Sequence, residues 1–502
     1  MKRGWLAGLS VLLMAGGLRA ESAPRTPCLD DVFLWLAGGL SSARIERLVG
    51  ISQGGTHLTC RVTSICIRAL QNGGADATLI QDVGGPSAVQ TAAHLKAASQ
   101  SQQNTSSGDC SCSGALTEAA ALVHSRNLNT AEEKVRSLLR NDPKNASLIF
   151  VLGTILRSQE RFDEALDAFM EAEQRGPGFP ETHNQISYLF YRTDDADDAL
   201  GEARTALSID PANAEGYRYL GLALYAKQHY DAALNALEKS LEREPENADA
   251  YFDIGITEHD KGELRQAAVA YRHALRLRPD FWQAHSNLGV TLHDQGKLDE
   301  SLAEYRTAIQ LKPDEPSVRN NLGNTLCDKE DFDNAIAEFK ALYRENPDWD
   351  GGHNCLARAY MAKRDYPAAI LELQVAIAAN PGGAVEHRVL GQALLLIGKD
   401  QEAAEALRKA VELKPESVLA HHYLGTALVN LQRFGEAEAE FREALKLEPS
   451  AQNHYALAAC LMALNRYEEA LGELEIASRL DPKENLYRAR MQEAARMITT
   501  TR

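Results

Sequence analysis

Prolines recur at a fixed interval through most of this chain. Proline ends a helix, because it lacks a backbone donor and its ring clashes with the preceding turn. A fixed period of this length indicates an array of helix pairs, stacked into a solenoid in which each unit packs only on its neighbours. Successive members lie 34 residues apart, and Pro482 follows the last by 33: Pro143, Pro177, Pro211, Pro245, Pro279, Pro313, Pro347, Pro381, Pro415 and Pro449.

Small residues recur at two further positions of the period, and aromatic residues recur at a third. Small side chains at both points let the two helices of a pair cross closely, and the aromatic rings fill the edge of the turn. The glycines are Gly153, Gly221, Gly255, Gly289, Gly323, Gly391 and Gly425, the alanines are at 165, 199, 233, 267, 335, 369, 403, 437 and 470, and the aromatic residues are Phe162, Tyr230, Phe332, Tyr366, Phe434 and Tyr467.

One unit shows the whole pattern. It opens with Trp282-Gln-Ala-His-Ser-Asn-Leu-Gly289 and continues to Tyr305 and Pro313. This pattern resembles the tetratricopeptide repeat family. The resemblance implies an all-α fold, a right-handed superhelical solenoid of about eleven helix pairs. The expected parts are a degenerate first repeat (115–145), the main array (146–484) and a C-terminal capping helix (485–500), which a solenoid end requires.

The residues before the array fall into three predicted segments. Residues 1–20 have the pattern of an export signal, because two basic residues precede an uncharged, mostly apolar stretch from Trp5 to Leu18. As a helix this stretch would be about 21 Å long, too short for a bilayer, which favours a cleaved signal peptide. Residues 28–95 are predicted to be a small helical module, with a repeated helix, Gly-Gly break and second helix. Residues 96–114, rich in Ser, Gln, Asn and Gly, are predicted to be a flexible linker.

Five of the eight cysteines lie in the first quarter of the chain. In an oxidising compartment up to two disulfides are expected among them, leaving one thiol over. A metal site at Cys110 and Cys112 is the weaker alternative, because no histidine cluster accompanies them. We therefore predict no metal and no cofactor.

Charge and motif content argue against several classes of function. The formal net charge is -17, with 53 basic and 70 acidic residues, and no dense basic run is present. Nucleic-acid binding and electrostatic membrane anchoring both need such cations, so neither is predicted. The chain has no nucleophile elbow, zinc-protease motif, phosphate loop or dinucleotide fingerprint. We therefore predict that it is not an enzyme.

Asparagines form the first candidate set of binding residues. In the tetratricopeptide repeat family the first helix of each unit lines the concave surface. Asn287 and Asn321 share one position there in successive units, with Asn320, Asn324 and Asn354 nearby. Amides can donate to and accept from a peptide backbone, and this ladder is similar to that of O-linked N-acetylglucosamine transferases. The alternative is that asparagine is only a common family residue at this position.

Aspartates and arginines form the second candidate set. A histidine or cysteine followed by aspartate recurs every 34 residues, as His259-Asp260, His293-Asp294 and Cys327-Asp328. Helix pairs stand about 10 Å apart, which we take as too far for successive units to share a zinc ion. With Asp249 and Asp253, the aspartates predict an acidic groove that favours a basic peptide, although a solvated polar face explains them nearly as well. Arg358 and Arg388 are predicted to meet an acidic or C-terminal carboxylate group.

Together these patterns predict a non-catalytic scaffold that binds a peptide or protein segment in its concave groove. The predicted signal peptide places it in the periplasm or outside the cell, without stable membrane insertion. The alternative is an accessory subunit of an enzyme, or of a secretion or assembly complex, whose catalytic part is another chain. The sequence names neither the partner nor the oligomeric state.

Overall fold

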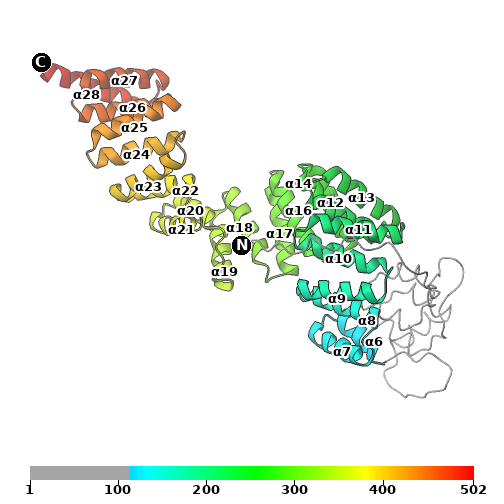
Figure 1. The fold of residues 1–502 in the computed structure, drawn as a ribbon. Helices are drawn as coiled ribbons and strands as arrows, with labels where there is room; N and C mark the ends of the chain where they lie inside the picture. Colours follow the sequence, from blue (N-terminus) through cyan, green and yellow to red (C-terminus); the bar gives the residue numbers. More distant parts are fainter. Residues whose placement is uncertain (1–113, 502) are drawn as a thin grey trace, which may run out of the picture. The chain divides into compact units, whose positions relative to one another are not determined.

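The computed structural model describes residues 114–501, which are coloured in Figure 1. The predicted signal peptide (1–20), the helical module (28–95) and the linker up to residue 113 lie outside the described residues, as do the cysteines of the first quarter. The chain divides into two compact units, Met1–Pro245 and Glu246–Arg502, and each unit is described by itself.

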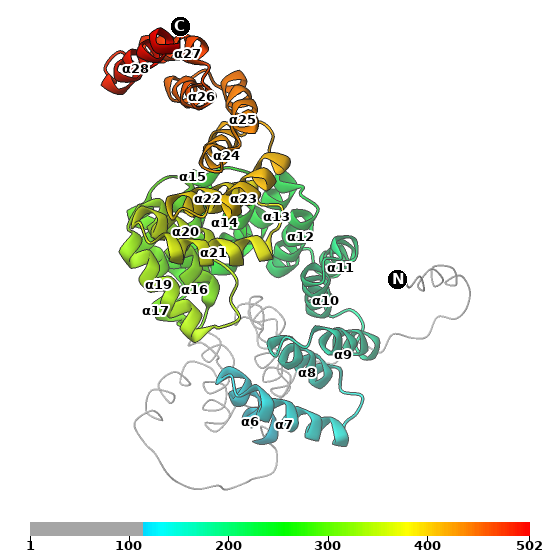
Figure 2. The ribbon, with the colours of Figure 1, turned by 90° about the vertical axis from the view of Figure 1, so that its left-hand side faces the viewer.

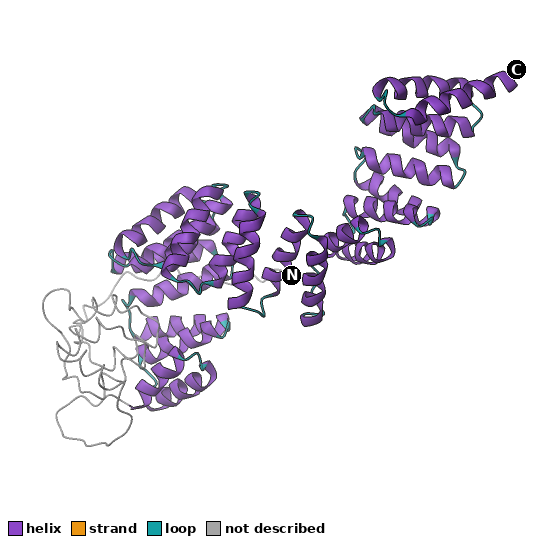
Figure 3. Cartoon of the chain, turned by 180° about the vertical axis from the view of Figure 1, so that it is seen from behind, coloured by secondary structure: helices purple, strands orange, loops and turns teal. Residues whose placement is uncertain are grey.

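Every regular element between residues 114 and 501 is an α-helix, 23 in all (Figure 3). In the first unit they are α6 (Gly114–His124), α7 (Leu128–Asn141), α8 (Ala146–Ser158), α9 (Phe162–Arg175), α10 (Pro180–Arg192), α11 (Ala196–Ile209), α12 (Ala214–Ala226) and α13 (Tyr230–Arg243). In the second unit they are α14 (Ala248–Asp260), α15 (Leu264–Leu277), α16 (Trp282–Asp294), α17 (Leu298–Leu311), α18 (Pro316–Asp328), α19 (Phe332–Glu345), α20 (His353–Ala362), α21 (Tyr366–Ala379), α22 (Ala384–Leu396), α23 (Asp400–Leu413), α24 (Val418–Asn430), α25 (Phe434–Leu447), α26 (Ala451–Ala463), α27 (Tyr467–Leu480) and α28 (Asn485–Thr501). None of these helices has both the length and the apolar composition needed to cross a bilayer.

Within each unit, every helix packs against the next helix of the chain, as α8 does with α9 (Figures 1 and 2). First helices of neighbouring pairs also touch, as α10 does with α12 and α22 with α24. The helices from α6 to α27 make eleven pairs, and α28 packs on α27 as a terminal helix. The predicted all-α repeat fold of about eleven helix pairs is therefore confirmed.

The recurring glycines lie where the two helices of a pair approach most closely. A Cβ added at Gly289 in α16 would lie 2.7 Å from the ring of Tyr305 in α17, and that ring is buried. The same contact recurs between Gly323 and Phe339. Because buried interiors are close-packed, the glycine and the aromatic residue form one packing unit in each of these repeats.

The recurring prolines lie one residue beyond the end cap of each second helix. In α17, for example, the helix ends at Leu311, and the backbone N–H of Lys312 still donates to Ala308 before Pro313 follows. Several first helices then begin directly after an asparagine that serves as the N-cap. The side chain of Asn247, for example, accepts a hydrogen bond from the backbone N–H of Ala250. Proline and N-cap together set the period of the array.

One repeat of the second unit departs from this regularity. The first helix α20 has 10 residues, whereas α14, α16, α18, α22, α24 and α26 have 13 each. The missing first turn is replaced by Gly351 and Gly352, and Gly352 adopts a left-handed φ of 92°. A side chain at Gly352 would collide with the ring of Phe339. The two glycines therefore delay the start of α20, although Pro347 keeps its place in the period.

Candidate peptide-binding groove

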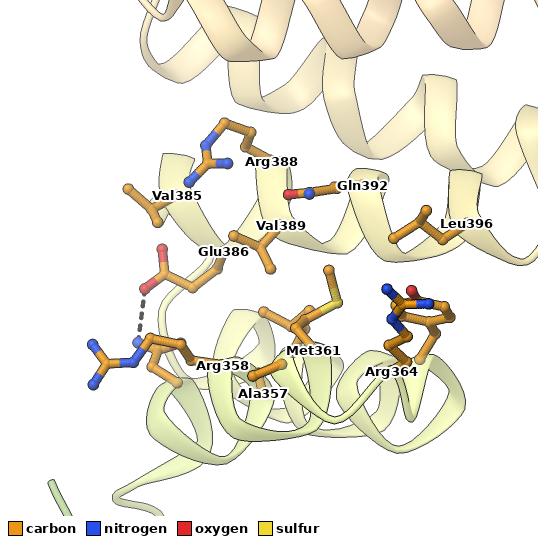
Figure 4. A pocket seen from close by; sticks show the side chains of 14 residues that line it. Ala357, Arg358, Met361, Arg364, Val385, Glu386, Arg388, Val389, Gln392 and Leu396 are labelled. Atoms are coloured by element: carbon orange, nitrogen blue, oxygen red, sulfur yellow. Dashed lines mark hydrogen bonds between the residues drawn. The ribbon is translucent and has the colours of Figure 1, made fainter. Parts of the chain in front are cut away.

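A cavity of about 640 Å³ opens between α20 and α22, the first helices of two neighbouring repeats (Figure 4). We call it the α20–α22 groove. Side chains from the two helices face each other across it, and the turn and helix after α20 close one side. Its lining consists of Asn354, Ala357, Arg358, Met361 and Ala362 on α20, Val385, Glu386, Arg388, Val389, Gln392 and Leu396 on α22, and Arg364, Tyr366 and Leu373 between them.

The exposed aliphatic side chains of the groove lie on α22. Its buried stripe, which includes Gly391 and Leu394, packs into the array. The lining residues Val385, Val389 and Leu396 recur at helical spacing on another side of the helix. Val385 is 56% exposed and Leu396 is 52% exposed. Aliphatic side chains therefore remain open to solvent where one repeat faces the next.

The polar part of the groove contains both paired and unpaired groups. The Asn354 side-chain amide donates to the Glu386 carboxylate at 2.8 Å, and Arg358 donates to Asp328 at 2.7 Å. The side chains of Arg364 and Arg388 have no hydrogen bond or ion pair with any residue of the described part of the chain. The groove therefore combines exposed aliphatic carbon with two guanidinium groups that lack a counter-charge.

Three of the predicted binding residues meet in this groove: Asn354, Arg358 and Arg388. The sequence reasoning found them because they lie on first helices, which line the inner surface. It missed the apolar residues Met361 and Val389. The available signal was the replacement of the asparagine of α16 and α18 by Val389 at the same position of the period.

Two other predicted residues, Asp260 and Asp294, belong to a row of alternating acids and bases across four repeats. His259 on α14 contacts Asp294 on α16 at 3.0 Å, and His293 contacts Asp328 on α18 at 2.9 Å. Asp260 lies 3.2 Å from His259, and Arg358 on α20 ends the row at Asp328. Side chains of successive units therefore contact each other in pairs along the stack.

The electrostatics of this row follow from its pairing. Burial by itself would lower the pKa of His293, but hydrogen bonds to Asp328 and Asp294 outweigh it and raise the pKa. Burial likewise works against the ionised form of Asp328, yet Arg358 and His293 lower its pKa. The aspartates of the row are therefore already paired with histidine and arginine side chains of the same chain. Between residues 114 and 501, no group of three or more His, Cys, Asp or Glu side chains could hold a metal ion.

The remaining predicted residues lie along α14, α16 and α18 and do not converge. Asp249 forms an ion pair with Arg278 at 2.6 Å, and Asp253 is only 4% exposed. The side-chain oxygen of Asn320 is buried without a hydrogen bond from any described residue. The side chains of Asn287, Asn321 and Asn324 are half-buried and make no hydrogen bond within residues 114–501. The asparagine ladder therefore stays a prediction, and so does its similarity to O-linked N-acetylglucosamine transferases.

A disulfide between Cys327 on α18 and Cys355 on α20 was not predicted. From the sequence, disulfides were expected only among the cysteines of the first quarter of the chain. The available signal was the position of the two cysteines, 28 residues apart on the first helices of neighbouring repeats. Cys460 on α26 is a free, buried thiol.

Stacked helix pairs of nearly constant length make this a helical repeat protein. The model of the family described as "Tetratricopeptide repeat" matches residues 116–180, 220–268, 320–384, 356–418 and 424–485, and the one described as "TPR repeat" matches residues 257–296 and 291–326. The first covers more than half of the chain. The chain therefore belongs to the tetratricopeptide repeat family. No curated protein matches it.

Several solved structures are similar to parts of the chain. MamA is 25% identical over 32% of this chain and 95% of that chain, with a TM-score of 0.27. The pilF protein of Pseudomonas aeruginosa is 19% identical over 41% and 94%, with a TM-score of 0.36. YrrB, described as a TPR protein with an unusual peptide-binding site, is 23% identical over 40% and 99%, with a TM-score of 0.31. Because these scores lie below 0.5, family membership rests on the sequence match.

Proposed function

We propose that this protein is a non-catalytic scaffold that binds an extended peptide segment in the α20–α22 groove. The observation that carries the proposal is the combination of unpaired arginines with exposed aliphatic side chains. Arg364 and Arg388 line the groove beside Val385 and Leu396. A largely apolar concave surface with a few convergent charged groups is the usual composition of a ligand site.

The same side chains indicate the chemistry of the peptide. A guanidinium group matches a carboxylate in geometry and charge, and the aliphatic wall suits leucine-like side chains. We therefore propose a segment that alternates acidic and aliphatic residues. This departs from the basic peptide expected from the aspartates, because Asp294 and Asp328 already pair with His259, His293 and Arg358.

A labelled peptide tests the proposal directly. The probe is a short fluorescein-labelled peptide that alternates aspartate and leucine, titrated with the full chain and followed by fluorescence anisotropy. Arg388→Ala is expected to weaken binding about tenfold, since a charge-assisted hydrogen bond contributes about 1.5–3 kcal/mol. The control is Arg306→Ala on α17, an exposed arginine that pairs with no described residue and lies outside the groove.

Two results would contradict the proposed site. One is equal affinity for the Arg388→Ala variant, the Arg306→Ala variant and the unmodified chain. The other is equal binding of a peptide that alternates lysine and leucine, since that would leave the arginines without a role.

We further propose that the scaffold acts outside the cytoplasm. The predicted signal peptide at residues 1–20 supports this, and the Cys327–Cys355 disulfide suits an oxidising compartment. N-terminal sequencing of the protein recovered from the envelope or medium is expected to begin after Ala20. Recovery from the cytoplasm with Met1 retained would contradict export.

A further inference from the structure

Two neighbouring first helices are joined by a covalent link. Cys327 on α18 and Cys355 on α20 form a disulfide with Cα atoms 6.0 Å apart. The two side chains belong to the core, at 1% and 8% exposure. The link therefore holds one repeat against the next from inside the stack.

The link joins α20, which forms one wall of the α20–α22 groove, to α18. Cys355 follows Asn354 in sequence and precedes Arg358 by one helical turn, and both of those residues line the groove. Cys327 precedes Asp328, which holds the Arg358 guanidinium at 2.7 Å. The disulfide and this ion pair thus fix the same helix to the same neighbour.

Among the first helices of the second unit, α20 gains most from an additional link. α20 lacks the first turn that the other first helices of the second unit have, because Gly351 and Gly352 replace it. A shorter helix buries less surface against its neighbours and opens more readily. The ion pair between Arg358 and Asp328 is partly exposed, so it contributes little by itself.

The reduced form also has partners for its sulfur atoms. The Cys327 sulfur lies 3.3 Å from the carbonyl oxygen of Cys355, and the Cys355 sulfur lies 3.6 Å from that of Gly323. As thiols, both can donate weak hydrogen bonds to these oxygens. Reduction is therefore expected to loosen α20 without unfolding the repeat.

We propose that the Cys327–Cys355 disulfide is a redox clamp that holds α20 in the position that forms the α20–α22 groove. This inference rests on the proposed function of that groove. Formation takes two steps of thiol–disulfide exchange with a disulfide oxidant such as oxidised glutathione. One cysteine thiolate attacks the oxidant and releases one glutathione thiolate, and the second cysteine displaces the other. Two cysteine thiols are oxidised, and one oxidant disulfide is reduced to two thiols.

The experiment compares oxidised and reduced full-length protein by two readouts. One is hydrogen–deuterium exchange of the α20 amides, and the other is anisotropy of the aspartate–leucine peptide. Dithiothreitol is expected to speed exchange in α20 about fivefold or more. It is also expected to weaken peptide binding about fivefold, because a preorganised site binds better than a mobile one.

The variant Cys327→Ala/Cys355→Ala and the control Cys460→Ala separate this clamp from the other cysteines. The double variant is expected to match the reduced protein and to be insensitive to dithiothreitol in both readouts. Cys460→Ala removes a buried thiol that forms no disulfide, so it is expected to respond as the unmodified chain does. If the double variant does not fold, reduction of the unmodified chain still provides both readouts.

The outcomes separate the clamp from the proposed function. Unchanged exchange and affinity on reduction, with binding still lost in Arg388→Ala, would overturn the clamp and leave the function standing. An equal response of the double variant and the unmodified chain to dithiothreitol would also overturn the clamp. If exchange in α20 responds but the peptide binds neither form, the proposed function fails and the regulatory role fails with it.

Discussion

At the scale of single residues, the repeat depends on a glycine under an aromatic ring. Gly289→Ala would place a Cβ 2.7 Å from the Tyr305 ring, and overpacking of this kind costs about 1–3 kcal/mol. Thermal unfolding followed by circular dichroism should show the loss.

Gly472 on α27 provides the matched control, because a Cβ there meets no atom within 4 Å. Gly472→Ala is expected to stabilise the helix by about 0.5–1 kcal/mol. Equal effects of the two substitutions would contradict a packing role for Gly289.

The asparagines of the first helices are the second case at this scale. Asn287 and Asn321 make no side-chain hydrogen bond within residues 114–501. Replacing both by alanine is therefore expected to change the free energy of unfolding by less than about 0.5 kcal/mol. If they bind a peptide backbone, affinity for the labelled peptide falls in the same variant. A clear fall in stability would instead make these amides structural.

At the scale of the helix pair, a histidine on the first helix forms a hydrogen bond with a glutamate on the second helix. The Nδ1 atom of His285 lies 2.6 Å from Glu304, and its Nε2 atom lies 3.1 Å from the carbonyl oxygen of Pro279. Both partners are acceptors, so the ring must carry two protons to donate to both. The same histidine–glutamate pair occurs as His183–Glu202, His353–Glu372, His421–Glu440 and His454–Glu473, and Arg319–Glu338 takes its place in one repeat.

These histidine–glutamate pairs predict that the stability of the folded chain falls as pH rises. Hydrogen bonding to glutamate raises the pKa of His183, His285 and His421 in the folded chain. The unfolded value is about 6.5, so the folded state binds the proton more tightly. Each pair contributes about 1 kcal/mol to the stability of the folded chain. This contribution is complete below the unfolded pKa and is lost as pH rises through the folded pKa.

Urea unfolding at about pH 6 and about pH 9, on either side of the histidine pKa, measures the effect. Glu304→Gln with Glu440→Gln is expected to reduce the difference in unfolding free energy between the two pH values. If the variant and the unmodified chain show the same difference in unfolding free energy between the two pH values, the histidines of these pairs are not protonated in the folded chain.

At the scale of the whole molecule, stability comes from a sum over neighbouring repeats rather than from one core. The last helix α28 contributes the buried residues Tyr487 and Ala494, and the Tyr487 ring lies 5.4 Å from that of Tyr455 on α26. Ending the chain after Glu484 would remove this cover.

Loss of α28 is therefore expected to raise hydrogen exchange in α26 and α27 while leaving α16 and α17 unchanged, because each repeat contacts only its neighbours. Peptide-resolved exchange checks this within the second unit. A uniform rise from α14 to α27 would contradict a nearest-neighbour stack and indicate one cooperative unit.

The sequence predicted the fold better than the site. Helix ends could be placed because each repeat contains the same local signals, a proline after one helix and a small residue where helices cross. α20 departs from this regularity, because Gly351 and Gly352 delay the helix although Pro347 keeps the period. Asn354, Arg358 and Arg388 were predicted from their position in the period alone; they line the same groove, and their role in binding stays a prediction.

By itself, the sequence determined the helix pairs, their number and the family, because these follow from contacts that recur at a fixed spacing in every repeat. The tertiary structure decided which polar groups are already paired, as Asp294 is with His259, and which are not, as Arg388. It also joined Cys327 to Cys355 and opened the groove between α20 and α22. These features depend on distances between side chains of different repeats, which no periodicity within one repeat specifies.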